Sequence, residues 1–244
     1  MAIDLFSGHA DQYAQYRIDY PAELYDFILA RVPLRQTAWD CATGNGQVAL
    51  ALADMFERIE ATDISENQLA QAVQHANVHY QVGPAERTTF PDHHFDLITV
   101  AQALHWFDAD AFHAEVRRVG KPGAVIAEWG YGLNQVDEAI DALVLDFYRN
   151  RVGPYWDSRR RLIDEQYASL PFPFADEQRA DFLVRRAWTL DRFLNYLRTW
   201  SSVQKYKFEN GDDPVTALGE ALLPVWGEGE KEVRFPVFLR AGIV

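Results

Sequence analysis

The 244-residue sequence has a single cysteine and no apolar run that approaches the roughly 18 residues of a membrane-spanning helix. One cysteine excludes an intramolecular disulfide and any metal site built from several cysteines, and it agrees with a reducing compartment. The first residues also lack the basic start and apolar segment of a signal peptide. We therefore expect a cytoplasmic globular protein that has no membrane span and no metal site.

Basic residues are scarce, because 23 Lys and Arg stand against 36 Asp and Glu, which gives a formal net charge of -13. Binding to nucleic acid or to anionic lipid needs a basic surface, so neither partner is expected. A local basic pocket can still exist inside an acidic protein, so a small-molecule substrate remains open. The sequence leaves the oligomeric state unknown.

Short apolar strands alternate with helices between residues 37 and 129. The expected strands cover 37–41, 58–62, 78–82, 95–101 and 124–129, and the expected helices 47–55, 66–74 and 110–119. Lys121 to Gly123 form a predicted turn. Strands separated by helices need crossover connections, so the pattern predicts an α/β fold with a doubly wound, mainly parallel, Rossmann-like sheet.

The regular alternation ends after Gly132, where helices are expected over 136–151, 157–167 and 190–200. Two further strands, 182–188 and 232–239, complete a seven-stranded sheet. We expect one compact unit made of an N-terminal helical segment, a ligand-binding core, a mostly helical cap with one strand that returns to the sheet, and a final sheet strand. These parts cover residues 1–35, 36–132, 133–230 and 231–244.

The turn after the first strand reads Asp40-Cys41-Ala42-Thr43-Gly44-Asn45-Gly46. Ligands of doubly wound sheets lie at the carboxyl ends of the strands, and Gly44 and Gly46 allow a tight turn and close approach of the backbone. Asp63, at the end of the second strand, is placed to accept hydrogen bonds from two ribose hydroxyls. The glycine spacing itself fits NAD and S-adenosylmethionine equally well.

Charge separates the two cofactors. Asp40 would lie unfavourably close to an anionic pyrophosphate, whereas it favours a ligand that carries an α-ammonium beside a sulfonium. The sequence therefore favours S-adenosylmethionine, with NAD(P)-dependent oxidoreduction as the alternative.

Asp40-x-Ala42-x-Gly44-x-Gly46 resembles motif I of the class I S-adenosylmethionine-dependent methyltransferases, which usually have glycine at the position of Ala42. Asp63-Ile64-Ser65, Ala85-Glu86 and the stretches 91–96 and 118–123 resemble later motifs of this family. The resemblance implies that Asp63 binds the ribose, that Glu86 beside Ala85 reads the adenine, and that residues 101–104 flank the methionine and the sulfonium.

Two further stretches resemble the trans-aconitate methyltransferase-like branch of this family: 13–21 and Ala101-Gln102-Ala103-Leu104-His105-Trp106-Phe107. In that branch the N-terminal segment folds over the cofactor, which implies that Arg17 contacts the methionine carboxylate and that Tyr13 or Tyr16 lines the pocket. The predicted cofactor-binding residues are Tyr13, Arg17, Asp40, Ala42, Gly44, Gly46, Asp63, Ile64, Ala85, Glu86, Ala101 and Gln102.

Residues 188–201 resemble the part of the same branch that walls the substrate pocket. His105 is a candidate general base for an alcohol or a carbon acid, although a carboxylate acceptor needs none and the side chain can instead hold a loop. Arg159 or Arg198 can pair with a substrate carboxylate. The predicted substrate-binding residues are His105, Trp106, Tyr155, Trp156, Arg159, Arg198 and Trp200.

The leading interpretation is an S-adenosylmethionine-dependent methyltransferase that acts on a small molecule, by O-methylation of a carboxylate. Besides the oxidoreductase, a non-catalytic binding protein with the methyltransferase fold remains an alternative. Fold class alone does not decide between them.

Overall fold

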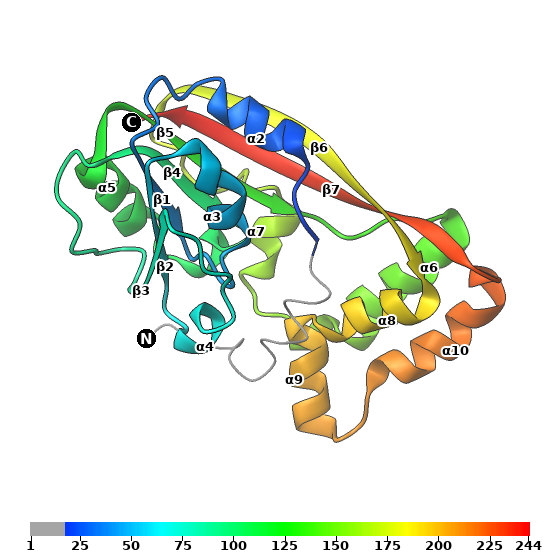
Figure 1. Ribbon diagram of the computed structural model, residues 1–244. Helices are drawn as coiled ribbons and strands as arrows, with labels where there is room; N and C mark the ends of the chain where they lie inside the picture. Colours follow the sequence, from blue (N-terminus) through cyan, green and yellow to red (C-terminus); the bar gives the residue numbers. More distant parts are fainter. Residues whose placement is uncertain (1–17) are drawn as a thin grey trace.

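A computed structural model describes residues 18–244 and has a seven-stranded sheet at its centre (Figure 1). The strand order across the sheet is β3-β2-β1-β4-β5-β7-β6. Only β7 runs antiparallel to its neighbours, so the predicted doubly wound, mainly parallel sheet is confirmed. The strands are β1 (Thr37–Cys41), β2 (Arg58–Asp63), β3 (Val78–Val82), β4 (Phe95–Ala101), β5 (Gly120–Tyr131), β6 (Ala175–Thr189) and β7 (Glu230–Ile243).

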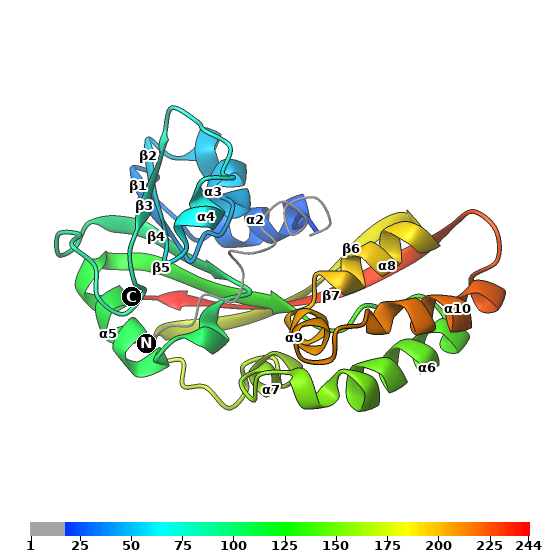
Figure 2. The same cartoon turned by 90° about the horizontal axis from the view of Figure 1, so that it is seen from below.

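Helices cover both faces of the parallel strands, which explains why these strands lack the polar alternation of a half-exposed sheet. Ala38 points to the face that packs against α2 (Ala22–Leu29) and α3 (Gln47–Leu52). The next residue, Trp39, points to the opposite face, where α5 (Ala109–Val119) packs. Figure 2 shows the two helical layers on either side of the sheet.

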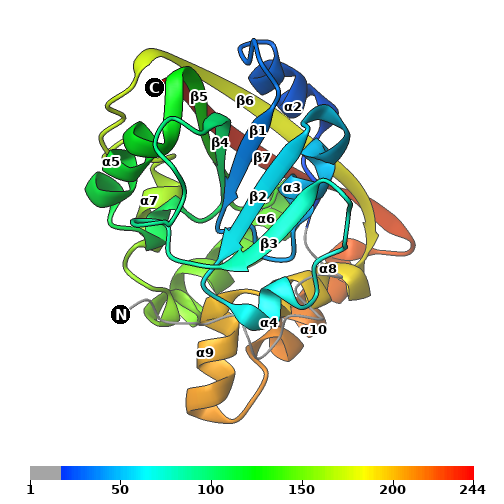
Figure 3. The ribbon, with the colours of Figure 1, turned by 60° about the vertical axis from the view of Figure 1, so that its left-hand side comes forward.

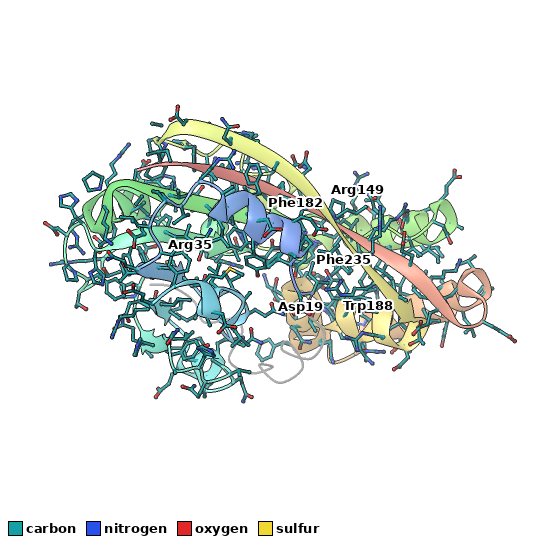
Figure 4. All side chains as sticks on the ribbon, turned by 45° about the horizontal axis from the view of Figure 1, so that its top comes forward. Asp19, Arg35, Arg149, Phe182, Trp188 and Phe235 are labelled. Carbon is teal, nitrogen blue, oxygen red and sulfur yellow. The ribbon has the colours of Figure 1, made fainter. Side chains whose placement is uncertain are left out.

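A group of helices lies beyond the end of the sheet and forms the cap (Figures 1 and 2). β6 and β7 reach it as a two-stranded ribbon, since β5 pairs only with 237–243 of β7 whereas β6 pairs with β7 from Glu230 onward. Trp188 and Phe235 pack on this ribbon with ring centroids 5.3 Å apart (Figure 4). The cap consists of α6 (Glu138–Asp146), η4 (Phe147–Arg151), η5 (Gly153–Tyr155), α7 (Arg160–Asp164), α8 (Leu190–Arg198), α9 (Ser201–Asn210) and α10 (Pro214–Trp226).

Several predicted elements have different limits in the structure. The helix predicted over 66–74 is only α4 (Glu66–Leu69): its N-cap Ser65 accepts a hydrogen bond from Gln68 N as expected, but the N–H groups of Gln71 and Ala72 then donate three residues back and the α-helix ends. The predicted turn at 121–123 is a bulge inside β5, where the pairing with β4 shifts register. The helix predicted over 157–167 is limited to α7.

Two short 3-10 turns complete the core. The helix predicted over 47–55 consists of α3 followed by η2 (Ala53–Met55), and η3 (Leu104–Trp106) follows β4. Because η3 begins three residues after the end of β4, it carries His105 and Trp106 at the carboxyl edge of the sheet. This edge is where a doubly wound fold holds its ligands.

A buried charged cluster joins the sheet to the segment that leads into β6. Glu128 on β5 accepts at 2.7 Å from Arg240 on β7, and its other oxygen lies 2.7 Å from Nε2 of His113 on α5. The Arg240 guanidinium also donates to the carbonyl groups of Tyr167 and Leu170. Glu128, His113 and Arg240 are each at most 2% exposed, so the ion pair is protected from water.

Replacing Arg240 by Met tests this cluster, because it leaves the Glu128 carboxylate buried without its cation. We expect the free energy of unfolding in urea to fall by about 3–5 kcal/mol. The double variant Arg240→Met with Glu128→Gln removes the unpaired charge and should recover part of the loss. A double variant that is as unstable as the single one would contradict an electrostatic origin.

Candidate functional site

The turn between β1 and α3 is built around the carboxylate of Asp40. Its Oδ2 accepts hydrogen bonds from the hydroxyl of Thr43 and, at 3.1 Å, from the backbone N–H of Ala49. Its Oδ1 accepts at 2.8 Å from the hydroxyl of Thr99 on β4. One side chain therefore connects the turn, the first turn of α3 and the neighbouring strand.

The backbone of this turn is left-handed at three positions, with φ values of +54° at Ala42, +58° at Gly44 and +83° at Gly46. Glycine adopts this conformation without steric cost, whereas an alanine loses about 1 kcal/mol. Ala42 thus keeps the glycine-like backbone that the turn requires, and the surrounding hydrogen bonds offset the strain.

Asp40 is 1% exposed, and no described Lys, Arg or His forms an ion pair with it. Burial raises its pKa from 3.8 to about 6, although hydrogen bonds from Thr43, Thr99 and Ala49 oppose the rise; the nearby charge of Asp63 adds to it. A rise of this size corresponds to about 3 kcal/mol, which is the cost of keeping the carboxylate ionised at neutral pH. A bound cation would offset that cost, so the site fits an ammonium group.

Asp63, at the end of β2, supports the same turn. Its Oδ2 accepts from the backbone N–H of Gly44 at 2.8 Å, and its Oδ1 accepts from that of Ser65 at 2.9 Å. The side chain of the adjacent Ile64 is exposed. In the loop after β3, Ala85 is buried, and the Oε1 of Glu86 accepts at 3.2 Å from the backbone N–H that precedes α5.

A cavity of about 500 Å³, which we call the first cavity, lies over this turn at the carboxyl edge of the sheet. Five of the predicted cofactor-binding residues line it: Asp40, Ala42, Gly44, Ala101 and Gln102. Gly46, Asp63, Ile64, Ala85 and Glu86 are not among its lining residues, and Tyr13 and Arg17 lie outside the described part of the chain. Sequence reasoning missed the other lining residues, which are Ile18, Tyr20, Thr43, Asn45, Gln47, Val48 and Tyr131.

A second cavity, of about 630 Å³, lies between the sheet edge and the cap. It shares Gln102 and Tyr131 with the first cavity, so the two spaces adjoin at the ends of β4 and β5. Its remaining lining residues are His105, Trp106, Gly132, Leu133, Trp156, Asp157, Arg160, Tyr196, Trp200 and Ser201.

Gln102 holds the junction of the two cavities in place. Its φ of +55° directs the chain out of β4, and its backbone N–H donates to the Trp129 carbonyl at 2.7 Å. Its side-chain Oε1 accepts at 2.8 Å from the backbone N–H of Tyr131. Gly130 leaves the space, since a Cβ at that position would lie 2.8 Å from the same oxygen.

Aromatic rings form most of the wall of the second cavity. The rings of Trp156 and Trp200 lie 5.6 Å apart, and those of His105 and Trp106 lie 4.9 Å apart. The guanidinium of Arg160 lies 4.9 Å from the Trp156 ring centroid. Such a wall favours a flat or apolar acceptor body with one charged group beside it.

The structure separates the predicted substrate-binding residues into two groups. His105, Trp106, Trp156 and Trp200 line the second cavity, whereas Tyr155, Arg159 and Arg198 are not among its lining residues. Tyr155 packs against Tyr206 on α9, with ring centroids 4.9 Å apart. An aromatic residue next to Trp156 in the sequence therefore faces a different helix.

The two predicted arginines are engaged by neighbouring carboxylates. Arg159 donates to both oxygens of Asp157, at 2.9 and 3.0 Å, and these hydrogen bonds hold the pKa of Asp157 at about 2. Arg198 donates to Asp213 at 2.7 Å. Arg160, which was not among the predicted residues, is the arginine of this segment that lines the cavity in place of Arg159. Adjacent residues of a helical turn point in different directions, so only one of the neighbouring arginines can face the cavity. Which one does so can be decided only once the position of α7 is known.

Comparison with known proteins agrees with this geometry. A family model described as a methyltransferase domain matches residues 39–127. A solved structure from Anaeromyxobacter dehalogenans, assigned as a type II methyltransferase, is 41% identical to this chain and superposes with a TM-score of 0.85. The match covers 93% of this chain and 98% of that one. A protein of Dictyostelium discoideum assigned as a methyltransferase is 28% identical over 97% of this chain and 93% of its own.

A more distant structure shares the fold. Phosphoethanolamine N-methyltransferase 2 of Haemonchus contortus, solved with phosphomonomethylethanolamine and S-adenosylhomocysteine, is 18% identical with a TM-score of 0.51, over 95% of this chain and 57% of that one. The chain belongs to the S-adenosylmethionine-dependent methyltransferases. The matches give no support to the oxidoreductase alternative.

Membrane-spanning helices and metal-binding groups can be assessed for residues 18–244 alone. None of the helices within 18–244 is both long and apolar enough to cross a membrane. Within the same range, no group of three or more His, Cys, Asp and Glu side chains is arranged to hold a metal ion.

The raised pKa of Asp40 predicts how cofactor binding depends on pH. A ligand ammonium prefers the ionised carboxylate, so affinity for S-adenosylhomocysteine should increase as the pH rises through about 6 and level off above it. Asp40→Asn keeps the shape and can donate to the Thr99 hydroxyl, yet it should bind about tenfold more weakly at pH 8 and lose this step. Calorimetric titration from pH 5 to pH 8 measures both; an identical pH profile in the variant would contradict the assignment.

Proposed function

We propose that this chain transfers a methyl group from S-adenosylmethionine, bound in the first cavity, to a small molecule bound in the second. The observation that carries the proposal is that the two cavities share Gln102 and Tyr131. The methyl group could therefore pass from the donor to the acceptor inside the protein. Asp40 would face the ammonium group of the donor, and Asp63 would be near its ribose.

The donor supplies an activated methyl group on a sulfonium, and the protein has to align the acceptor and exclude water. The aromatic wall suits both tasks, because its rings have few rotatable bonds and present apolar faces to the acceptor. The Gln102 side chain holds the backbone of Tyr131 in place through hydrogen bonds to its N–H and carbonyl groups. The junction is therefore held in shape before either ligand binds.

We further propose that the acceptor is a carboxylate, as in the trans-aconitate methyltransferase-like branch that the sequence resembles. Arg160 supports this proposal: its Nε donates to the Tyr148 hydroxyl at 3.0 Å, and no hydrogen bond joins its two terminal nitrogens to a described residue. A guanidinium with two parallel donors matches a carboxylate. Its partner Asp164 is 3.6 Å away and half exposed, so the positive charge is only partly offset.

Arg160→Gln should raise KM for a carboxylate acceptor by about tenfold or more, since a bidentate charged hydrogen bond is lost. The matched control is Arg161→Gln, which removes the next arginine of α7, an exposed side chain paired with Glu165. The assay is methyl transfer to a series of mono-, di- and tricarboxylates and their neutral amides. Equal effects of the two substitutions, or preference for the amides, would contradict a carboxylate acceptor.

Substitution of His105 distinguishes a carboxylate acceptor from a hydroxyl acceptor. A carboxylate oxygen is nucleophilic without a base, so His105→Gln should leave kcat for it within about threefold, whereas general-base catalysis contributes about 100-fold or more. Binding of S-adenosylhomocysteine to the variant serves as the control for folding. A loss of kcat of about 100-fold with intact binding has the size of a general-base contribution and would point to a hydroxyl or carbon acceptor. If the cofactor product binds but no acceptor is methylated, the non-catalytic alternative gains support.

A further inference from the structure

The turn over 42–46 receives one side chain from each of three adjacent strands. Asp40 of β1 and Asp63 of β2 hold it by the hydrogen bonds described above. The third side chain is Tyr80, which lies on β3 at the edge of the sheet (Figure 3). Neither the family motifs nor the first cavity includes this tyrosine.

The sheet register directs Tyr80 toward the turn. Tyr80 is paired with Ala61 on β2, and Ala61 is paired with Asp40 on β1, so the three side chains lie in one row on the same face. Ala61 is completely buried and small. The phenol ring can therefore extend across β2 to the beginning of α3.

The ring ends against the backbone of Gly46. A Cβ at this position would lie 2.3 Å from the Tyr80 hydroxyl oxygen and 2.9 Å from its Cζ and Cε1, closer than any real contact. The hydroxyl is fixed in turn, since it donates to the Val73 carbonyl at 3.0 Å. Gly46 is thus required by the neighbouring ring as well as by its own φ of +83°.

No described side chain is hydrogen-bonded to Gly46, whose N–H donates to the Thr43 carbonyl and whose carbonyl accepts from the Leu50 N–H. Asp40 and Asp63 hold the beginning of the turn and the body of α3 by side-chain hydrogen bonds, whereas the side chain that holds Gly46 is the Tyr80 ring, by packing. The left-handed residues would otherwise sample other conformations, and binding would have to restrict them at a cost in affinity.

We propose that Tyr80 is a positioning residue of the donor site, whose ring sets the place of Gly46 and so keeps the turn in the shape that receives S-adenosylmethionine. This rests on the proposed location of the donor in the first cavity. The titratable groups beside the adjoining Asp40 carboxylate are Tyr25 from α2, Asp63 from β2 and Tyr80 itself, and none of them is a cation. Tyr80 acts by the space that its ring occupies against Gly46.

The test is calorimetric titration of the full chain with S-adenosylhomocysteine, at a temperature well below unfolding. Tyr80→Ala should raise Kd by about tenfold, whereas Tyr80→Phe keeps the ring and should stay within about twofold of the wild type. Phe182→Ala is the matched control, because it removes a half-buried ring from β6 at the opposite edge of the sheet (Figure 4). Tyr80→Leu replaces the alanine variant if the latter does not fold.

Gly46→Ala, made with and without Tyr80, tests the contact itself. In the wild-type background the added methyl group meets the ring and adds to the backbone strain; in the Tyr80→Ala background only the strain remains. The fold-increase in Kd caused by Gly46→Ala should therefore be smaller without the ring. Wild-type affinity in Tyr80→Ala, or strictly additive effects, would overturn the proposal. Failure of the wild type to bind would instead contradict the proposed donor site.

Discussion

A buried carboxylate without a cationic partner among the described residues is the constraint on which the site depends. Asp40 ends β1 and is almost fully enclosed, yet three hydrogen bonds from Thr43, Thr99 and Ala49 hold it in place. Ionising it in the empty protein is costly, as its raised pKa shows. The same interactions that stabilise the turn therefore create a place where a cation is favourable, and S-adenosylmethionine carries two cationic groups.

The rest of the architecture forms a second cavity beside that place. The long ribbon of β6 and β7 extends past the sheet, and the helices between its strands return over the carboxyl edge (Figure 1). Arg240, paired with Glu128, fixes the segment after α7 to the sheet. The second cavity lies next to the first, with Gln102 and Tyr131 shared between them.

Much of the first cavity could be predicted from the sequence, because its residues follow strands directly. Asp40, Gly44 and Gln102 occur at the ends of β1 and β4, which are neighbours in the sheet, and strand ends of a doubly wound sheet lie together. The second cavity could not be predicted in the same way. Arg160 and Arg159 are adjacent in sequence, and only the packing of α7 against the sheet decides which one lines the cavity.

The limits of the elements show a similar division. Ser65 identifies the beginning of α4 through its own hydroxyl, which is a local property. The early end of α4, where the N–H groups of Gln71 and Ala72 donate three residues back, has no such local signal. The length of β6 likewise depends on its pairing with β7, about 50 residues downstream, which local pattern cannot report.

The most direct test of the central claim is a crystal structure of the protein with S-adenosylhomocysteine. We expect the amino group of the ligand to face Asp40 and its sulfur to lie at the junction formed by Gln102 and Tyr131, open to the second cavity. A ligand whose sulfur points away from that cavity, or whose amino group is remote from Asp40, would contradict it.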